Sequence, residues 1–277
     1  MPKLFEILEK RELAPRIKEL KIYNPRIAAK VKAGQFLIIR VSEEGERIPL
    51  TAVDWDRREG TVTIVFQEVG VSTYKLGKLE VGDALADMVG PLGNPSEIDT
   101  FGTVVCVGGG VGVAAIYPIA RELKRAGNKV ISIIGVRSRD LIYRAMEVSD
   151  EVRVTTDDGS KGRRGFVSDE LRDLLVSGLK VDRVVTVGPA IMMKVCADVT
   201  RPYGVKTIAS LNPIMVCGIG VCGACRVEVA GKTRFACFEG PEFDAHQVNF
   251  DELLKRLKAY RAEEQMALKL YLEGGGR

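Results

Sequence analysis

Long hydrophobic runs are missing from this sequence, and no segment approaches the ~20 consecutive apolar residues that a membrane-spanning helix needs. Residues 1–13 alternate charged and apolar side chains and lack the apolar core of a signal peptide. We therefore expect a cytoplasmic protein without a membrane span. Thiols stay reduced in that compartment, so the six cysteines are expected to be metal ligands, catalytic groups or buried apolar residues rather than disulfides.

An excess of one charge sign is also missing. The chain has 41 Lys and Arg against 37 Asp and Glu, which gives a formal net charge of +4, and the two signs are interspersed. This balance argues against nucleic acid as a partner and indicates a solvated surface. With 277 residues, 46% of them hydrophobic, the chain is long enough for two compact domains with their own cores.

The first hundred residues have the pattern of short strands. Residues 36–41 and 61–66 are rich in β-branched and aromatic side chains and are separated by Gly, Pro and charged turns. These features predict a small antiparallel barrel. The segment 90–95, GPLGNP, is dense in residues that break secondary structure and predicts a domain boundary, which we place after residue 98.

From residue 103 the pattern changes to alternating strands and helices. Residues 103–107 form a continuous apolar run, as expected of a parallel strand buried on both faces. Further strands are predicted at 129–135, 151–155 and 183–188, and helices at 113–126 and 168–176. This alternation predicts an α/β domain with a doubly wound, mostly parallel sheet, which we assign to residues 99–209.

The remaining segment, 210–277, has a pattern of its own. Residues 211–240 are rich in Gly and Cys and too irregular for a helix, whereas residues 251–272 return to helical periodicity and predict one amphipathic helix. That helix is expected either to pack on its own domain or to form part of an interface with a partner.

The most specific pattern is Cys217-x4-Cys222-x2-Cys225-x11-Cys237. Glycines within this loop allow the backbone to wrap closely and to point its amides at sulfur, and a hairpin over 226–236 would bring the fourth cysteine. The spacing indicates a 2Fe–2S cluster, with a structural zinc site as the alternative. Two other cysteines, Cys106 and Cys196, lie in apolar runs and are expected to be buried apolar residues.

A glycine run, GGGVG over residues 108–112, follows a predicted buried strand and opens a predicted helix. Glycine at such a turn lets a pyrophosphate approach backbone amides at the positive end of the helix dipole. The spacing differs from the common G-x-G-x-x-G. The candidate binding residues are Gly109, Gly110, Val111 and Gly112.

Two further motifs follow the ends of later predicted strands. Asp157 and Asp158 come after one strand, and Gly188 and Pro189 after another. Ligands of open parallel sheets bind at the carboxyl ends of the strands, so these residues are candidates for nucleotide binding. The alternative for the two aspartates is a role as turn or capping residues.

The predicted barrel carries two weaker motifs. Residues 47–51, RIPLT, place a cation, a rigid proline and a hydroxyl on nearby strand positions, and residues 70–73, GVST, supply small hydroxyl and amide donors. From the residues alone these motifs only suggest a ligand site, and Arg47 by itself is better explained as a surface charge.

The order of these motifs resembles the ferredoxin–NADP reductase superfamily over essentially the whole chain. R-x-P-x-T, G-x-S-T, GPLG, GGGVG, DDGS and GPxxMM precede the four cysteines. The resemblance is to the branch that holds the electron-transfer subunit of dihydroorotate dehydrogenase and the small subunit of NADH-dependent reduced ferredoxin:NADP oxidoreductase.

This resemblance implies FAD in the barrel, NADH or NADPH in the second domain, and the cluster beside the flavin. It places Arg47 on the flavin phosphates, Pro49 and Leu50 along the isoalloxazine ring, Thr51 near its N5 atom, and Gly70, Ser72 and Thr73 on the diphosphate. Arg137 is a further nucleotide-binding candidate. No acidic run follows it, and basic residues lie nearby in the sequence, so NADPH remains an alternative to the favoured NADH.

The resemblance also implies a larger partner subunit with its own flavin and 4Fe–4S clusters, and ferredoxin as an indirect partner. The expected function is electron transfer between NAD(P)H, FAD, the 2Fe–2S cluster and that subunit, in either an electron-bifurcating or a non-bifurcating enzyme. The alternatives are the dihydroorotate-linked subunit and a non-catalytic zinc-binding module. Hydride transfer to a flavin needs no acid–base group, and the only histidine, His246, is expected to make a structural hydrogen bond.

Overall fold

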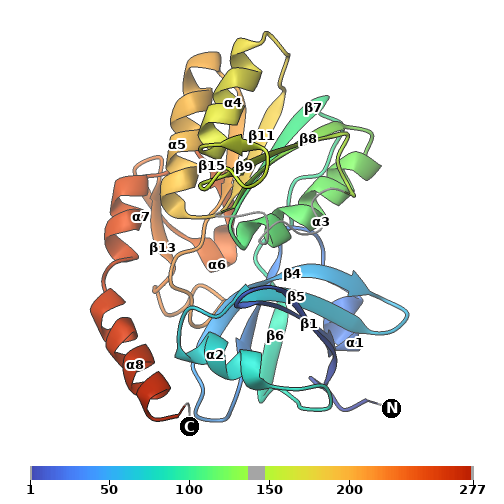
Figure 1. Ribbon diagram of the computed structural model, residues 1–277, viewed down its shortest axis with the longest axis vertical. Helices are drawn as coiled ribbons and strands as arrows, with labels where there is room; N and C mark the ends of the chain where they lie inside the picture. The colour runs from blue at the N-terminus through green and yellow to red at the C-terminus, as the bar shows by residue number, and fades with distance from the viewer. Residues whose placement is uncertain (1, 137–146, 276–277) are drawn as a thin grey trace.

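The computed structural model describes residues 2–136 and 147–275. A curved antiparallel sheet and a mostly parallel sheet with helices lie one above the other in Figure 1, and the C-terminal segment runs down one side of both. Within the described residues, no helix is long and apolar enough to cross a membrane.

The antiparallel sheet is the predicted barrel. Its six strands are paired in the order β1-β2-β5-β4-β3-β6. A bridge between Glu6 and Ala84 connects the first strand to the chain just before the last one and closes the curve. The elements are β1 (Ile7–Ala14), β2 (Ile17–Tyr23), α1 (Pro25–Ala28), β3 (Phe36–Arg40), β4 (Arg47–Asp56), β5 (Thr61–Gln67), α2 (Val71–Lys78) and β6 (Asp87–Leu92).

Strand β3 is buried on both faces, which explains its continuous apolar sequence. Leu37 and Ile39 point into the barrel core. Phe36 and Ile38, on the opposite face, pack into a second core together with the cysteine-containing segment. Because side chains of a strand alternate between faces, one short strand joins the two cores.

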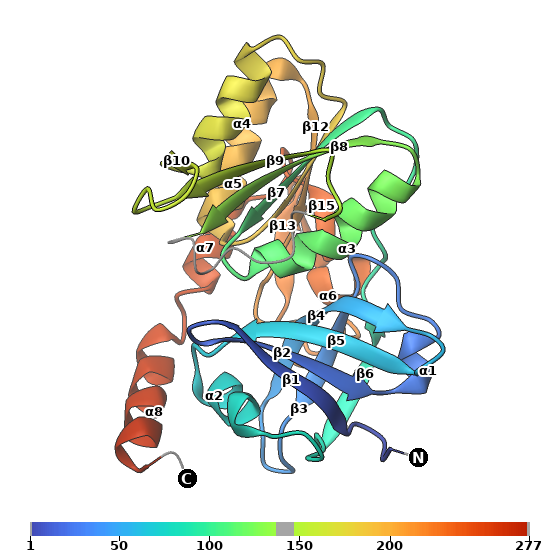
Figure 2. The same ribbon diagram turned by 45° about the vertical axis from the view of Figure 1, so that its right-hand side comes forward.

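The second sheet is parallel except for its last strand, and its order is β10-β9-β8-β7-β11-β12-β15. Helix α3 covers one face of the sheet, and helices α4 and α5 cover the other (Figure 2). The elements are β7 (Thr103–Gly109), α3 (Gly112–Arg125), β8 (Lys129–Val136), β9 (Glu151–Thr156), β10 (Arg163–Arg164), α4 (Val167–Val176), β11 (Arg183–Val187), α5 (Ala190–Thr200), the 3₁₀ turn Arg201–Tyr203, β12 (Lys206–Ser210) and β15 (Glu242–Asp244).

The C-terminal segment is joined to both sheets. It contains the predicted hairpin, and its strand β15 pairs with β12 at the edge of the parallel sheet. Residues of the chain between the two sheets also bind it, since Asn94 donates to the carbonyls of Phe238 and Glu239 and Ser96 donates to the carboxylate of Glu242. The remaining elements are β13 (Arg226–Val229), β14 (Lys232–Phe235), α6 (Ala236–Glu239), α7 (Phe250–Arg256) and α8 (Arg261–Glu273).

The single helix predicted over 251–272 is wrong, because the structure has two helices separated by a turn. Residues of α7 pack into the core of the cysteine segment, where Leu253 is fully buried. Helix α8 instead lies against α2 of the barrel through Tyr271. The two halves therefore pack on different parts of the molecule. The one-turn helix α6, at the fourth cysteine, was also not predicted.

Candidate functional site

The four cysteines of the motif come together as two pairs. The loop that precedes β13 carries Cys217, Cys222 and Cys225, and the turn after β14 carries Cys237. The Sγ atoms of Cys225 and Cys237 are 3.1 Å apart. The Sγ of Cys217 accepts hydrogen bonds from the backbone amides of Ile219 and Cys222, both at 3.5 Å.

Three glycines give this loop its shape. Gly218, Gly220 and Gly223 all have φ between +72° and +79°, a region that residues with a side chain rarely adopt. The amide of Gly220 donates to the Sγ of Cys237 over 3.1 Å. The loop therefore directs several N–H groups at sulfur, which stabilises thiolates.

Cys217 and Cys237 differ in their electrostatic surroundings. Burial alone raises the pKa of Cys217, but hydrogen bonds from backbone amides, including those of Cys222 and Ile219, outweigh it and lower the pKa to about 6. Burial, together with the neighbouring Cys225, raises the pKa of Cys237 to about 12. A bound metal centre would hold all four sulfurs as thiolates.

This arrangement suits a centre with two metal ions better than a centre with one. A structural zinc ion needs four ligands around a single point. A cluster with two irons needs two thiolates at each iron, which matches the observed pairs.

The other two cysteines are buried, as predicted. Cys106 lies within β7 and Cys196 within α5, and both are fully buried. Burial raises the pKa of each thiol to about 12. Both thiols stay protonated and behave as small apolar side chains.

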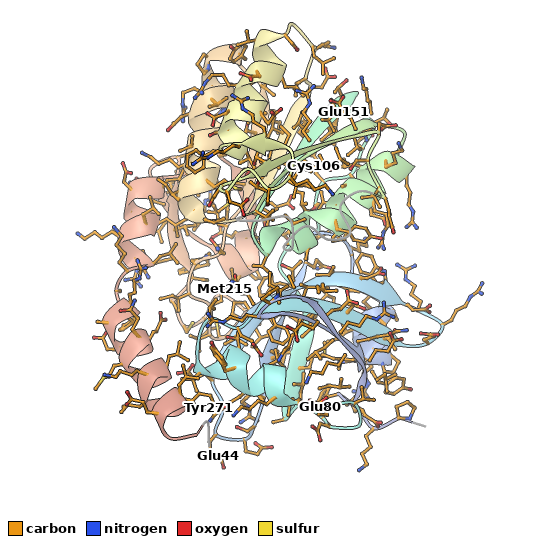
Figure 3. All side chains as sticks on the ribbon, in the orientation of Figure 1. Glu44, Glu80, Cys106, Glu151, Met215 and Tyr271 are labelled. Carbon is orange, nitrogen blue, oxygen red and sulfur yellow. The ribbon has the colours of Figure 1, made fainter. Side chains whose placement is uncertain are left out.

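A cleft lies where the barrel, the parallel sheet and the cysteine segment meet. Predicted flavin residues Pro49, Leu50 and Thr51 line it from β4. Val187, at the carboxyl end of β11, lines it from the parallel sheet. The cysteine segment contributes the stretch just before Cys217, including Met215, which Figure 3 places between the two sheets.

Several residues that line this cleft were not predicted from the sequence. They are Gly34, Phe36, Val187, Ser210, Leu211, Asn212, Met215 and Pro241. The segment NPIMV, residues 212–216, directly precedes the first cysteine, so its closeness to the metal site could have been inferred from the spacing. The contribution of Gly34 and Phe36 depends on long-range packing and leaves no local signal.

The other predicted flavin residues belong to the barrel but do not line the cleft. Arg47 is half exposed and its guanidinium lies 3.5 Å from the carboxylate of Asp87. Gly70 precedes α2, and the hydroxyl of Ser72 donates to Glu46 over 3.0 Å. The hydroxyl of Thr73 accepts from the amides of Val69 and Gly70 and donates to the Gly70 carbonyl, so it shapes the start of α2.

The glycine run turns from β7 into α3 as expected. Gly109 ends the strand, Gly110 has φ +57° and Gly112 begins the helix. A Cβ on Gly112 would lie 2.4 Å from the carbonyl oxygen of Val187, so this glycine allows α3 to approach the end of β11 closely. Val111 lies between them at the helix N-cap.

The same edge of the sheet brings the later glycine motif next to this run. Strands β7 and β11 are neighbours, and a Cβ on Gly188 would lie 3.1 Å from the carbonyl oxygen of Gly109. A Cβ on Gly109 would likewise contact Pro189. The structure therefore joins these two motifs into one surface at the carboxyl ends of the strands.

The aspartate pair lies at the end of β9, two strands away from β7. Both side chains are exposed. The Asp158 carboxylate accepts a hydrogen bond from the backbone amide of Ser160, and hydrogen bonds from Ser160 lower the pKa of the Asp158 carboxyl. This geometry fits the turn role named as an alternative. Arg137 lies outside the described residues.

His246 makes the structural contact that was expected. Its Nε2 lies 2.9 Å from the hydroxyl of Thr200, which also accepts from Thr207. This short hydrogen-bonded chain fastens the end of α5 to β12 and to the segment after β15, and it lies apart from the cleft.

Comparison with known proteins identifies relatives along the whole chain. Residues 212–249 match the family described as the iron–sulfur cluster binding domain of dihydroorotate dehydrogenase B, which supports the iron–sulfur interpretation over zinc. A Thermotoga maritima protein named as a homolog of the electron transfer subunit of dihydroorotate dehydrogenase B (NAD(+)) is 46% identical, covering 99% of this chain and 97% of that protein. The Geobacillus thermodenitrificans electron transfer subunit is 32% identical, covering 87% of this chain and 96% of that protein.

Solved structures agree with this result. A chain in the structure of an NADH-dependent reduced ferredoxin-NADP oxidoreductase superposes with a TM-score of 0.93 at 45% identity, covering 98% of this chain and 99% of that chain. Phthalate dioxygenase reductase superposes with a TM-score of 0.61 at 17% identity, covering 81% of this chain and 85% of that one, which shows a shared fold. The predicted combination of a barrel and an α/β domain is thereby confirmed.

Proposed function

The chain belongs to the family of electron transfer subunits of dihydroorotate dehydrogenase B, and from this premise we propose that it carries electrons from NAD(P)H through FAD and a 2Fe–2S cluster to a larger partner subunit. The membership agrees with the resemblance inferred from the order of its motifs. The proposed units are an FAD-binding barrel over 1–98, a nucleotide domain over 99–209 and a cluster segment over 210–277.

The observation that carries this proposal is the shared cleft. Its walls come from the barrel motif 49–51, from the end of β11 beside the glycine motifs, and from the stretch that leads into Cys217. A flavin ring at this place would have the nucleotide site on one side and the cluster loop on the other. An electron carrier needs such adjacency, because the protein's contribution to redox chemistry is chiefly position and orientation.

The chain's own groups suit these cofactors. Cys217, Cys222, Cys225 and Cys237 would hold the cluster as two pairs, and the loop amides would stabilise the thiolates. The first-turn amides of α2 have no intrahelical acceptors and would receive the FAD diphosphate, with Arg47 as its counter-charge. An FAD bound by these residues would supply the chemistry that couples two-electron transfer from a nicotinamide to single-electron transfer toward the cluster.

The nucleotide is proposed to bind across the carboxyl ends of the parallel strands. Gly109, Gly110 and Gly112 would admit its pyrophosphate to the backbone, and Gly188 and Pro189 would form the adjoining surface. NADH is favoured because the T. maritima and G. thermodenitrificans relatives are named for NAD(+). NADPH is the alternative, since Lys161 and Arg164 are exposed near the end of β9.

The partner is proposed to be a larger oxidoreductase subunit with its own flavin and 4Fe–4S clusters, through which ferredoxin would be reached. The cysteine segment exposes apolar side chains as well as Cys222, since Val216, Ile219, Val221 and Phe238 are each exposed by 46–80%. Such a surface is typical of a protein contact. A dihydroorotate-oxidising subunit is the second candidate, which the names of several relatives favour.

The test is an anaerobic titration of the purified chain with NADH and, separately, with NADPH, following its visible absorption. We expect both flavin and cluster absorption to bleach with the preferred nucleotide. In the Cys225→Ser variant only the flavin should bleach, which separates the two steps. A chain that carries both cofactors but is bleached by neither nucleotide would contradict the proposed electron route. Co-purification with each candidate large subunit would then identify the partner.

A further inference from the structure

The C-terminal helix α8 has no evident role in the proposed electron route, yet it is fixed to the flavin domain. It packs beside α2 in both views of the molecule (Figures 1 and 2). Tyr271 is its only buried residue, with 8% of its surface exposed. The ammonium groups of Lys75 and Lys78, both from α2, lie 5.8 and 5.1 Å from the centre of the Tyr271 ring.

A pocket lies between this helix, α2 and the loop that joins β3 to β4. Its lining residues are Val41, Glu44, Gly45, Glu46, Val71, Ser72, Lys75 and Ala267. The cavity measures about 220 Å³. That volume is several times the ~30 Å³ that a single water molecule occupies in the liquid, so the pocket is large enough for part of an organic ligand.

We propose that this pocket receives the adenosine half of the FAD and that α8, through Ala267, closes its outer wall. The inference rests on the proposed function, which places the FAD diphosphate at the first turn of α2. Val71 and Ser72 belong to that first turn and also line the pocket. A dinucleotide held there by its diphosphate would therefore extend directly into the pocket.

The chemistry of the walls suits a nucleoside better than another phosphate. The carboxylates of Glu44 and Glu46 accept hydrogen bonds, as Glu46 does from the Ser72 hydroxyl, so they suit the hydroxyls of a ribose. Val41, Val71 and Ala267 provide apolar surface for a flat base. The diphosphate would lie at the start of α2, so the Glu46 carboxylate, which accepts a hydrogen bond from Ser72 there, must turn away from the helix terminus to admit it.

Tyr271 supplies a second polar group at the same junction. It lies one turn beyond Ala267 on the same face of α8, and Lys75 both lines the pocket and lies over its ring. Figure 3 shows this side chain at the end of α8 next to the barrel. Its hydroxyl is buried and has no hydrogen-bond partner among the described residues. A ligand in the pocket would supply this hydroxyl with a hydrogen-bond partner, which the described residues do not supply.

This assignment makes α8 a determinant of the preference for FAD over FMN, because FMN lacks the adenosine half. The test replaces Ala267 with Trp, which fills the pocket from the α8 side, and measures the affinity of the flavin-free chain for FAD and for FMN. Ala262→Trp is the matched control, since Ala262 is exposed on the same helix and does not line the pocket.

We expect wild type and Ala262→Trp to bind FAD more tightly than FMN. Ala267→Trp should lower the FAD affinity about tenfold while the FMN affinity and the iron content stay unchanged. Unchanged FAD affinity in Ala267→Trp, or an equal loss for both flavins, would overturn the inference alone. If the wild-type chain binds neither flavin, the proposed function fails with it.

Discussion

The glycine that holds the cysteine loop against the barrel offers a quantitative test of the structure. Gly218 has φ +76°, and a Cβ at this position would lie 2.6 Å from Leu92 Cδ1 and 3.0 Å from Ile38 Cγ1. Both of these residues belong to barrel strands. Any side chain at residue 218 must therefore displace either the cysteine loop or the side chains of Leu92 and Ile38.

Gly218→Ala combines two costs. The left-handed conformation costs a residue with a Cβ about 1–2 kcal/mol. Overpacking an existing contact adds about 1–3 kcal/mol, and the lower half of this range applies where the mobile end of Leu92 can shift. Gly231→Ala is a matched control, because Gly231 has φ +70° and no atom within 4 Å of the Cβ position. Gly231→Ala therefore carries only the cost of the left-handed backbone conformation.

The assay is urea unfolding of both variants beside wild type, together with iron content after anaerobic purification. We expect Gly218→Ala to lose about 1 kcal/mol or more of unfolding free energy beyond Gly231→Ala. It should also lose iron faster during dialysis, because its cluster loop has moved. If the two variants agree within about 0.5 kcal/mol, the spread usual for neutral surface changes, and keep iron equally, the contact between loop and barrel is refuted.

Three further predictions follow from individual side chains. Cys217→Ser should lower the iron content below the wild-type value of about two per chain, whereas Cys196→Ala should retain it, as iron analysis would show. Arg47→Ala should weaken FAD binding about tenfold by removing the counter-charge of the diphosphate, and the exposed control Arg57→Ala should not, as measured by flavin fluorescence titration. Burial raises the pKa of Glu242, so the folded state binds this proton more tightly than the unfolded state. The protonated Glu242 therefore stabilises the folded state fully below the ordinary carboxyl pKa of 4.5, and this contribution declines as pH rises. The unfolding free energy of Glu242→Gln should accordingly rise relative to that of wild type between acid and neutral pH. A difference in unfolding free energy that does not change with pH would contradict this.

Local patterns in the sequence were sufficient to predict most strands and helices. The continuous apolar run after residue 102, the glycines that end it and the helical spacing that follows all depend on residues close in sequence, and the structure has β7 and α3 there. The cysteine spacing likewise predicted a loop followed by a hairpin, because ligands of one cluster must converge.

Features that depend on distant contacts were not predicted. The break between α7 and α8 has no glycine or proline to mark it, and it exists because Leu253 and Tyr271 pack on different parts of the molecule. The hydrogen bonds of Asn94 and Ser96 to the cysteine segment join residues about 145 positions apart. The side chain of Glu242 also gains its buried surroundings only when the two sheets come together.

We propose above all that these four cysteines hold a two-iron cluster beside a flavin. The most direct measurement is the content of iron, acid-labile sulfide, zinc and flavin in the anaerobically purified chain. We predict about two irons, about two sulfides and no zinc, with one FAD per chain. A colourless chain that holds one zinc ion and no flavin, even after reconstitution with iron, sulfide and FAD, would contradict the account.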